Sequence, residues 1–305
     1  MFRLIFRLTL PLAFLATVSL AMAQPSGSSG GPWRTSIEGG AIHQFDADLD
    51  DGGSYSVSRA SIEAGIAYAT GPRNSIGLSL GYSRDDYSFD GADGLAGRKP
   101  WETVNEYRIS TPIRFGVGDR TNFFALPSVR WSAESGGDFS EAMTTGLIAG
   151  ANYRVSDRLT IGPGIGVFDE IEDSVNAFPI LLIDWKITDT VSLETGGGLG
   201  ATRGPGLQLT STALADWTLG LGARYETFRF RLDEDGVFAN GVGEEKGVLT
   251  YFSATYRPNP SLSVSALAGM EVGGKLRLED ASGQLIDRDD ADAAPFIGFA
   301  FSIRL

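Results

Sequence analysis

The sequence predicts an all-β protein, a single transmembrane antiparallel up-and-down β-barrel of about fourteen strands. Apolar and polar residues alternate over one segment of about ten residues after another, which places one face of each strand in an apolar medium and the other among polar groups. Short polar turns and long acidic loops alternate between these segments, an asymmetry typical of membrane barrels. After residue 23, no apolar run approaches the roughly 20 residues of a spanning helix.

The first 23 residues have the organisation of a secretory signal peptide. Arg3 and Arg7 precede an apolar stretch over residues 8–20, and small residues lead to a cleavage site between Ala23 and Gln24. We therefore expect export and a bacterial outer-membrane location. The expected organisation is a signal peptide over residues 1–23, a flexible Ser/Gly/Pro-rich leader over residues 24–33, and the barrel over residues 34–305.

Composition narrows the function classes. Removal of Arg3 and Arg7 leaves 23 Lys and Arg against 38 Asp and Glu, a net charge of −15, which disfavours nucleic acid as a partner. The chain contains no cysteine, so neither disulfides nor a lipoprotein anchor are available to it. Nothing in the sequence calls for a cofactor.

The strand pattern is clearest near the C-terminal end. Even-numbered residues from Leu262 to Leu278 are apolar, whereas Glu271, Lys275 and Arg277 fall on the opposite face. Near residues 206–231 the apolar phase switches after Tyr225, which predicts a β-bulge or a strand longer than the lipid is thick, and makes twelve strands the alternative count. The fourteen expected strands are 34–46, 54–70, 74–88, 103–116, 122–133, 142–154, 159–169, 175–187, 190–201, 206–213, 216–231, 246–257, 261–278 and 294–305.

The last ten residues carry the most specific signal. Ile297, Phe299, Phe301 and Ile303 alternate with small or polar residues up to the terminal Leu305. This segment resembles the C-terminal strand of bacterial outer-membrane β-barrels, which the barrel-assembly machinery recognises, although that pattern prefers a terminal Phe or Trp. The whole expected barrel resembles a family of outer-membrane β-barrels of unknown function. The resemblance implies fold and location, with outer-membrane lipids, lipopolysaccharide and the assembly machinery as partners, but no site residues.

A soluble β-sandwich or lectin-like domain is the alternative fold, because its strands also alternate. The unbroken run of hairpins, the unequal turns and the terminal strand favour the barrel.

Charged residues on the expected lumen face are the candidate functional residues. A charge on the lipid face costs about 2–4 kcal/mol at the midplane, so these side chains are expected to point inward. They either line a pore and tune its selectivity or form ion pairs that cross-link the strands. Arg108, Arg114 and Arg130, on neighbouring strands, are our candidates for a positive wall. The full candidate set is Arg108, Arg114, Arg130, Arg224, Glu226, Glu271, Lys275 and Arg304.

Two function hypotheses follow. The first is a porin-like channel for small polar solutes, which the many lumen-side glycines favour because they leave room for water. The second is a structural or interaction barrel with a filled lumen and functional outer loops. A channel for hydrophobic substrates of the fatty-acid-transporter type is less favoured, because only about ten residues precede the first strand. Neither oligomeric state nor solute is legible in the sequence.

Metal binding and catalysis are weaker alternatives. Asp46, Asp48 and Asp50 resemble an oxygen-ligand calcium loop, but the glycine comes one place late and the twelfth position is Val57. A lipid- or peptide-hydrolysing barrel would depend on His43, the only histidine, which is expected on the lipid side and has no serine at a recognisable spacing. We therefore expect no enzyme activity.

Overall fold

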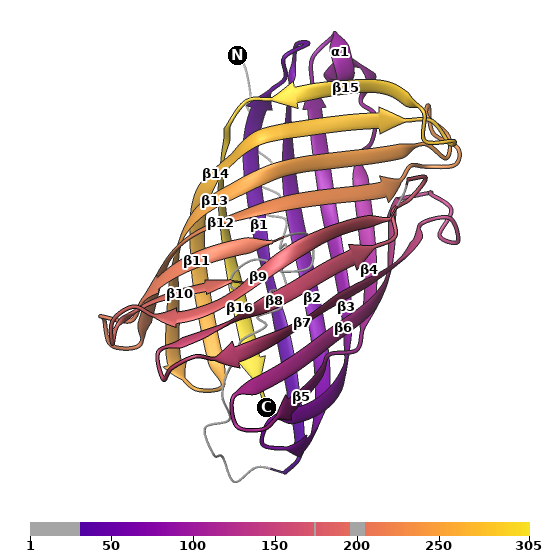
Figure 1. Cartoon of the computed structure of the whole chain (residues 1–305). Helices are drawn as coiled ribbons and strands as arrows, with labels where there is room; N and C mark the ends of the chain where they lie inside the picture. The colour runs from indigo at the N-terminus through magenta and orange to yellow at the C-terminus, as the bar shows by residue number, and fades with distance from the viewer. Residues whose placement is uncertain (1–30, 174, 196–204) are drawn as a thin grey trace.

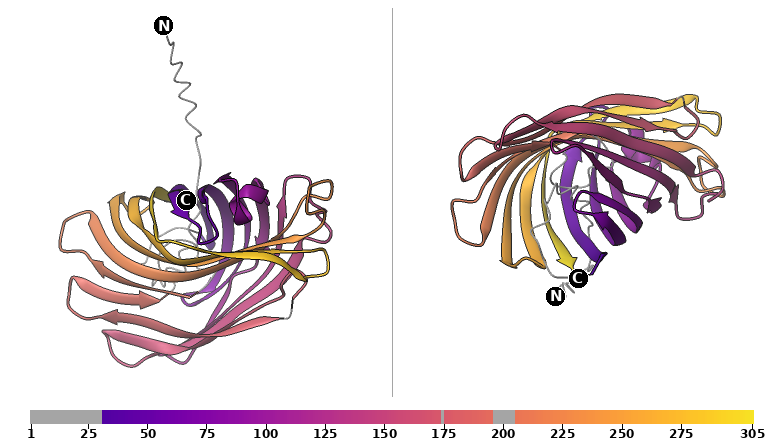
Figure 2. Two further views of the ribbon diagram at one scale, coloured as in Figure 1. Left: turned by 90° about the horizontal axis from the view of Figure 1, so that it is seen from above. Right: turned by 60° about the horizontal axis from the view of Figure 1, so that its bottom comes forward.

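The computed structural model describes residues 31–173, 175–195 and 205–305, and over these residues the chain forms a closed antiparallel β-barrel (Figures 1 and 2). Sixteen strand segments make fourteen barrel strands, because β4 and β5 are two parts of one strand and β15 and β16 are two parts of another. The predicted fold and strand count are confirmed. The expected signal peptide, its cleavage site, most of the leader and residues 196–201 of one expected strand lie outside the described residues.

The elements are β1 (Trp33–Asp48), β2 (Ser54–Gly71), β3 (Asn74–Asp90), α1 (Gly94–Arg98), β4 (Thr103–Ser110), β5 (Ile113–Val117), β6 (Thr121–Glu134), β7 (Met143–Arg154), β8 (Leu159–Phe168), β9 (Asn176–Lys186), β10 (Val191–Thr195), β11 (Gly206–Ser211), β12 (Trp217–Arg231), β13 (Val242–Asn259), β14 (Leu262–Glu279), β15 (Leu285–Ala291) and β16 (Ala294–Arg304). None of the helices in the described residues is long and apolar enough to span a bilayer.

Barrel closure brings the first and last strands together. β1 pairs with β16 from Ser36 opposite Arg304 to Gln44 opposite Phe296, and every other strand pairs with its neighbours in the sequence. Both ends of the barrel chain therefore lie at the end that carries the short turns, which we call the inner end. In outer-membrane barrels this end faces the periplasm. The opposite, outer end carries the long connections, and there β12 also meets β6, with Arg231 opposite Ala133.

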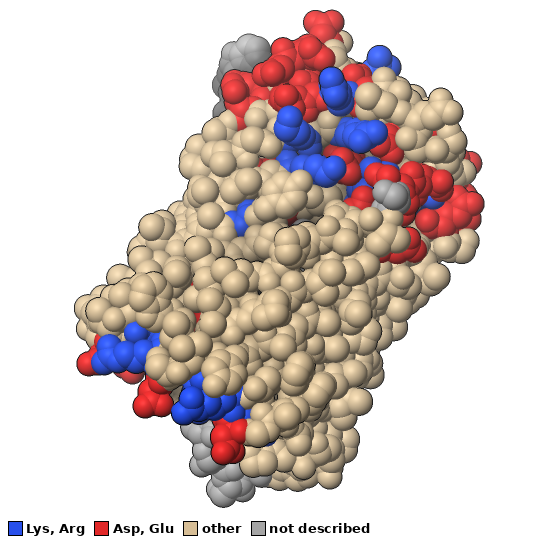
Figure 3. Space-filling model, viewed as in Figure 1, with Lys and Arg blue, Asp and Glu red and all other residues tan. Residues whose placement is uncertain are grey.

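The outer surface has the polarity of a membrane protein. Figure 3 shows charged groups gathered toward the two ends of the barrel, with a broad uncharged zone between them. Large apolar side chains such as Leu80, Leu221 and Ile297 are more than half exposed on this zone. Exposed aromatic residues mark the inner rim, as expected of an interfacial girdle, and include Tyr68, Phe115, Tyr153, Trp185 and Tyr256.

Strands near the outer end extend past the lipid zone, and there their apolar side chains point inward and their charged side chains outward. β12 pairs with β13 without a break, so the apolar phase switch after Tyr225 reflects a strand that outlasts the lipid. Beyond that point Phe228 and Phe230 are buried inside, while Arg229 lies on the other face. The expected strands leave residues 279–293 as a loop, and this expectation is partly wrong. The second half of the segment forms β15, which extends β16 and pairs with β14.

Candidate functional site

The lumen is open at the inner end and filled at the outer end. At the inner end a cavity of about 750 Å³ lies inside the barrel and reaches three short turns, through Arg73 of β2–β3, Asp157 of β7–β8 and Ser261 of β13–β14. Its volume lies within the range of small-molecule sites, about 300–1,000 Å³. The cavity is therefore large enough for a small solute and is reached from the inner side.

Cations outnumber anions in the cavity lining, although the whole chain has a net charge of −13. The lining includes eight basic residues, Arg34, Arg73, Arg114, Arg154, Arg158, Lys186, Arg257 and Arg304. It includes three acidic residues, Asp157, Asp184 and Glu194. Among the described residues the lining charges thus sum to +5, and this part of the lumen attracts anions.

Apolar residues line the end of this cavity that lies toward the middle of the barrel. Tyr251, Leu267 and Ala300 line it and belong to a buried cluster on four adjacent strands, β13, β14, β16 and β1. The other members of this cluster are Ile42, Leu249 and Phe296.

A charged layer lies between the inner cavity and the outer end of the barrel. Arg59 of β2 reaches across the lumen to β13, with its Nη2 2.5 Å from Oε1 of Glu245, and lies 3.5 Å from Asp85 and 4.0 Å from Glu271. The hydroxyl of Tyr87 donates to Oε2 of Glu245 at 2.7 Å. All these groups are buried, so a hydrogen-bonded network joins opposite walls of the barrel where an open pore would be expected. Beside Arg59 the remaining space of about 10 Å³ suits a single water molecule.

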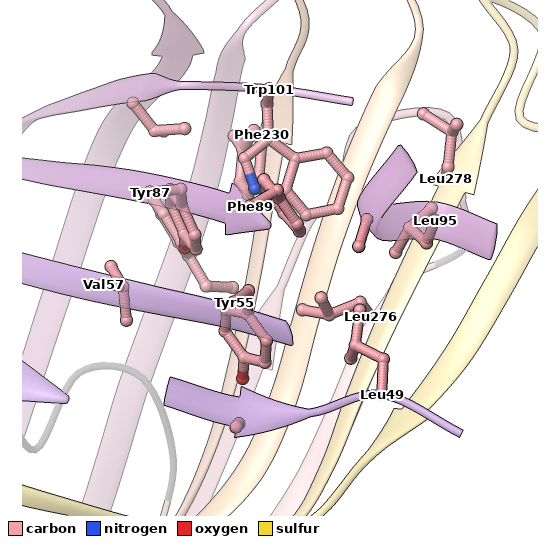
Figure 4. Packing of buried hydrophobic residues seen from close by; sticks show 14 of the residues in the cluster. Leu49, Tyr55, Val57, Tyr87, Phe89, Leu95, Trp101, Phe230, Leu276 and Leu278 are labelled. Carbon is pink, nitrogen blue, oxygen red and sulfur yellow. The ribbon is translucent and has the colours of Figure 1, made fainter. Parts of the chain in front are cut away.

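The outermost layer is an apolar cluster that resembles the core of a soluble domain (Figure 4). Its members come from β1–β4 on one side and from β12, β14 and β16 on the other. They are Ala47, Leu49, Tyr55, Val57, Tyr87, Phe89, Leu95, Ala96, Trp101, Val104, Phe228, Phe230, Leu232, Leu276, Leu278 and Ala294. We call this set the outer cluster.

The β3–β4 connection, residues 91–102, contributes the part of the outer cluster that does not belong to the barrel wall. Leu95 and Ala96 of α1 are fully buried, and the ring of Trp101 meets those of Phe89 and Phe230 edge to face at 5.5 and 5.3 Å. Outside, Arg98 pairs with Asp287 of β15 at 2.9 Å. This connection is therefore a plug inserted from the outer side and fastened at its rim. We call residues 91–102 the plug loop.

The candidate residues predicted from sequence occupy different layers. Arg114 and Arg304 line the inner cavity, and Glu271 belongs to the charged layer. Arg108 is paired with Glu63 at 2.7 Å and Arg224 with Glu226, whose Oε1 lies 2.8 Å from the arginine Nε. The guanidinium of Arg130 lies over the ring of Phe168, 4.7 Å from its centroid. Arg108 and Arg130 are opposite each other on β4 and β6, whereas Arg114 lines the inner cavity apart from them.

Lys275 is not a lumen residue. Pairing between β13 and β14 shifts between Lys246 and Val248, and the backbone at Gly273 has a φ of 63°, so a β-bulge turns the outer part of β14 over. Leu276 and Leu278 consequently face the outer cluster, whereas the side chain of Lys275 is 62% exposed and pairs with Asp290 at 3.1 Å. The side chain of Arg277, which is on the same face as Lys275, likewise points outward.

Several glycines on the lumen side do not leave the room for water that the sequence predicts. A Cβ added at Gly222 would lie 2.5 Å from the ring of Tyr251, and one at Gly150 would lie 2.8 Å from the ring of Phe124. Gly166 is covered in the same way by Phe178. The space that these glycines leave is filled by aromatic rings of neighbouring strands.

The weaker alternatives gain little from the structure. Within the described residues, no group of three or more His, Asp or Glu is arranged to hold a metal ion, so Asp46, Asp48 and Asp50 do not converge. Nδ1 of His43 lies 2.9 Å from Oγ of Ser58, its partner on β2, a Ser–His contact that sequence spacing did not reveal. His43 otherwise packs edge to face against Phe45 at 4.8 Å, and no described carboxylate contacts it to complete a catalytic triad.

Sequence reasoning missed the residues that close the lumen. Glu245 lies in a stretch expected to be a loop, although continuing the alternation of β13 by one residue would have placed it inward. Trp101 and Leu95 belong to an expected outer loop, where their apolar character was the available signal for burial. Basic residues beside short turns, such as Arg73 and Arg257, were the signal for the inner cavity.

Comparisons with known proteins agree with this architecture. No family model and no curated protein matches the chain. Among solved structures it is similar to a FadL homologue from Pseudomonas aeruginosa, with 12% sequence identity, 95% of each chain covered and a TM-score of 0.50. It is also similar to an outer-membrane channel from Pseudomonas putida F1, with 7% identity, 91% of this chain and 97% of that chain covered and a TM-score of 0.49.

A third similar structure is the toluene transporter TodX from P. putida, with 7% identity, 91% of each chain covered and a TM-score of 0.45. At such identities the likeness concerns the fold alone. The chain thus has the fold of the bacterial outer-membrane β-barrels, the class to which its apolar belt and inward-facing charges also assign it.

Proposed function

We propose that this protein is an outer-membrane passage for small polar solutes whose inner half is permanently open and whose outer half is closed by a movable plug. The observation that carries the proposal is the inner cavity of about 750 Å³, which is reached from the short-turn end and whose lining combines charged and hydroxyl side chains with apolar ones such as Phe178 and Leu182. The outer half of the same lumen is filled by side chains, so the open inner half is not a simple consequence of the width of the barrel.

The plug loop is the element best suited to move. It is not part of the barrel wall. Its short helix and Trp101 pack in the outer cluster, Arg98 forms an exposed ion pair with Asp287, and the backbone of Glu102 bonds to Tyr87 and to the Glu134 side chain. The indole N–H of Trp101 is buried without a hydrogen-bond acceptor among the described residues, which lowers the stability of the closed position. Loops with such contacts open more readily than strands do.

Conductance in planar lipid bilayers tests the proposal. We expect the native protein to be closed most of the time, and deletion of residues 92–99 to raise the time spent in a conducting state at least tenfold. Adding Arg59→Ser to the deletion removes the cross-lumen contact of the charged layer and should increase the single-channel conductance further.

Deletion of residues 235–237 is the matched control, because it shortens another outer connection whose Val237 is 87% exposed. It should leave the conductance unchanged. Each variant is checked for folding by its heat-dependent migration on a gel. If both plug variants fold and remain silent, the passage does not exist.

A filled barrel that supports functional outer loops is the second candidate. It is favoured by a specific observation, namely that sixteen buried residues and a charged network fill the outer half of the lumen. Silence of the folded plug variants would leave this function in place.

A further inference from the structure

We propose that the inner cavity is a binding site for small organic anions that carry two or more negative charges, and that one arginine-rich wall of the cavity holds them. The inference rests on the proposed function, because it names the solute class of the same cavity. The wall consists of Arg34 of β1, Arg73 of the β2–β3 turn, Arg114 of β5, Arg257 of β13 and Arg304 of β16. We call these five residues the arginine wall.

The excess of positive charge lies on this wall. The three acidic residues of the lining lie in the β7–β8 turn and on β9 and β10, next to the other three basic residues, although one of them, Glu194, also attracts Arg257 of the wall. This part of the lining is therefore balanced, with three cations against three anions, and Arg158 is also paired with Asp189 at 2.6 Å. The net charge of +5 in the described lining equals the charge of the arginine wall.

Register places two members of the arginine wall side by side. Ser36 of β1 is opposite Arg304 of β16. Arg34 is two residues nearer the inner rim on β1 and faces the same side as Ser36. Only β14 separates Arg304 from Arg257, and the charges of these two arginines repel each other. Arg34 and Arg114 repel each other in the same way. A bound anion relieves such repulsion, and it does so more effectively when it carries more than one charge.

Hydroxyl groups fill the surface between the arginines. Ser263 of β14 is opposite Ser302 of β16, and both line the cavity together with Ser265 and Thr255. Guanidinium groups bind carboxylates and phosphates in a bidentate manner. Because Ser302 donates to Glu38 and Thr255 bonds to Ser265, Ser263 is the hydroxyl best placed to donate to a remaining oxygen of the anion. The wall is thus suited to a polar polyanion rather than to an apolar molecule.

The surroundings strengthen the attraction. The cavity is enclosed by a barrel wall whose outer face is apolar, and a low-dielectric wall concentrates the field of the lining charges in the lumen. The predominantly acidic remainder of the chain lies outside the cavity, much of it in the outer loops, so the inner cavity is the place where an anion is favoured.

Calorimetric titration of the full chain in detergent micelles tests the site. Citrate, succinate and acetate serve as probes with three, two and one carboxylates. We expect affinity to rise in this order and to fall as salt is added, because salt screens the wall. Failure of citrate to bind at millimolar concentration, or equal affinity for citrate and acetate, would overturn the proposal.

Two double variants of equal charge change separate the wall from general positive charge. Arg34→Gln with Arg304→Gln removes two members of the arginine wall and should weaken citrate binding at least tenfold. Arg120→Gln with Arg288→Gln removes two arginines outside the cavity lining, one in the β5–β6 turn at the same end and one on β15 at the outer end, and should change it less than twofold. Equal weakening by both pairs would contradict a site on the arginine wall.

This outcome is distinguishable from that of the passage itself. If citrate binds but the folded plug variants remain silent, the site exists without a passage. If the plug variants conduct and show no preference for anions in their reversal potential, the passage exists and the anion site does not.

Discussion

At the scale of single residues, several glycines of this barrel make room for an aromatic ring of a neighbouring strand. Gly222 and Gly150 lie on strands next to those of Tyr251 and Phe124, whose rings occupy the volume that a side chain at the glycine would need. The rings thereby cover the glycines and take up the space next to the barrel wall. Composition alone suggested water-filled space at these positions, because the ring that fills each gap comes from another strand.

Gly222→Ala should therefore destabilise the barrel, by about 1–3 kcal/mol, because the new Cβ would lie 2.5 Å from the ring of Tyr251. Urea titration of protein folded in lipid vesicles measures the change in the free energy of unfolding.

Gly81→Ala is the matched control, since its Cβ would meet only the ends of two side chains, Arg108 at 3.3 Å and Glu63 at 3.5 Å, and it should cost less. In a Tyr251→Ala background the effect of Gly222→Ala should largely disappear. Equal costs at the two glycines, or no coupling to Tyr251, would refute this account.

At the scale of elements, the contact between β2 and β13 across the lumen is the most consequential, because a barrel strand otherwise contacts only its two neighbours. Arg59 pairs with Glu245 and lies within ion-pair distance of Glu271 and Asp85 in the charged layer. Without it, buried carboxylates of different strands would lose a counter-charge that they share.

Arg59→Leu should consequently cost about 3–5 kcal/mol, the amount typical of removing one partner from a buried ion pair. Arg84→Leu serves for comparison, because Arg84 forms an exposed pair with Asp86 at 2.8 Å, and its loss should cost less than about 1 kcal/mol. The same urea titration measures both. A similar cost for the two variants would mean that the cross-lumen contact adds nothing.

Strand number, strand order and the lipid-facing residues were predictable because they depend on local alternation. The contents of the lumen were not. Whether Arg59 faces water or Glu245 depends on the distance between β2 and β13 across the lumen. That distance is set by how far the barrel is flattened at its outer end, where β12 meets β6, and no local sequence pattern predicts it. Lys275 shows the second cause of error, since one bulge near Gly273 inverts every later residue of the strand.

At the scale of the whole molecule, the apolar zone between the two charged ends determines where the barrel sits in the bilayer. Leu221 of β12 is 62% exposed in this zone and faces Leu209 and Phe252 on the neighbouring strands. Leu221→Arg should lower the stability of the barrel in lipid by about 2–4 kcal/mol.

Val237→Arg, at an 87% exposed position in an outer loop, should have no measurable effect. Folding into vesicles, followed by gel migration with and without heating, reports both variants. Tolerance of arginine at Leu221 would contradict the membrane position assigned here.

The outer cluster also has a consequence for how the barrel is made. Of the described residues, its members fall within 47–104 and 228–294, with residues 105–227 contributing none. During assembly the two groups meet only after the intervening chain has been threaded into strands, and loops this long close slowly. We therefore expect the lumen to stay unfilled at its outer end until the last hairpins of the barrel have been added.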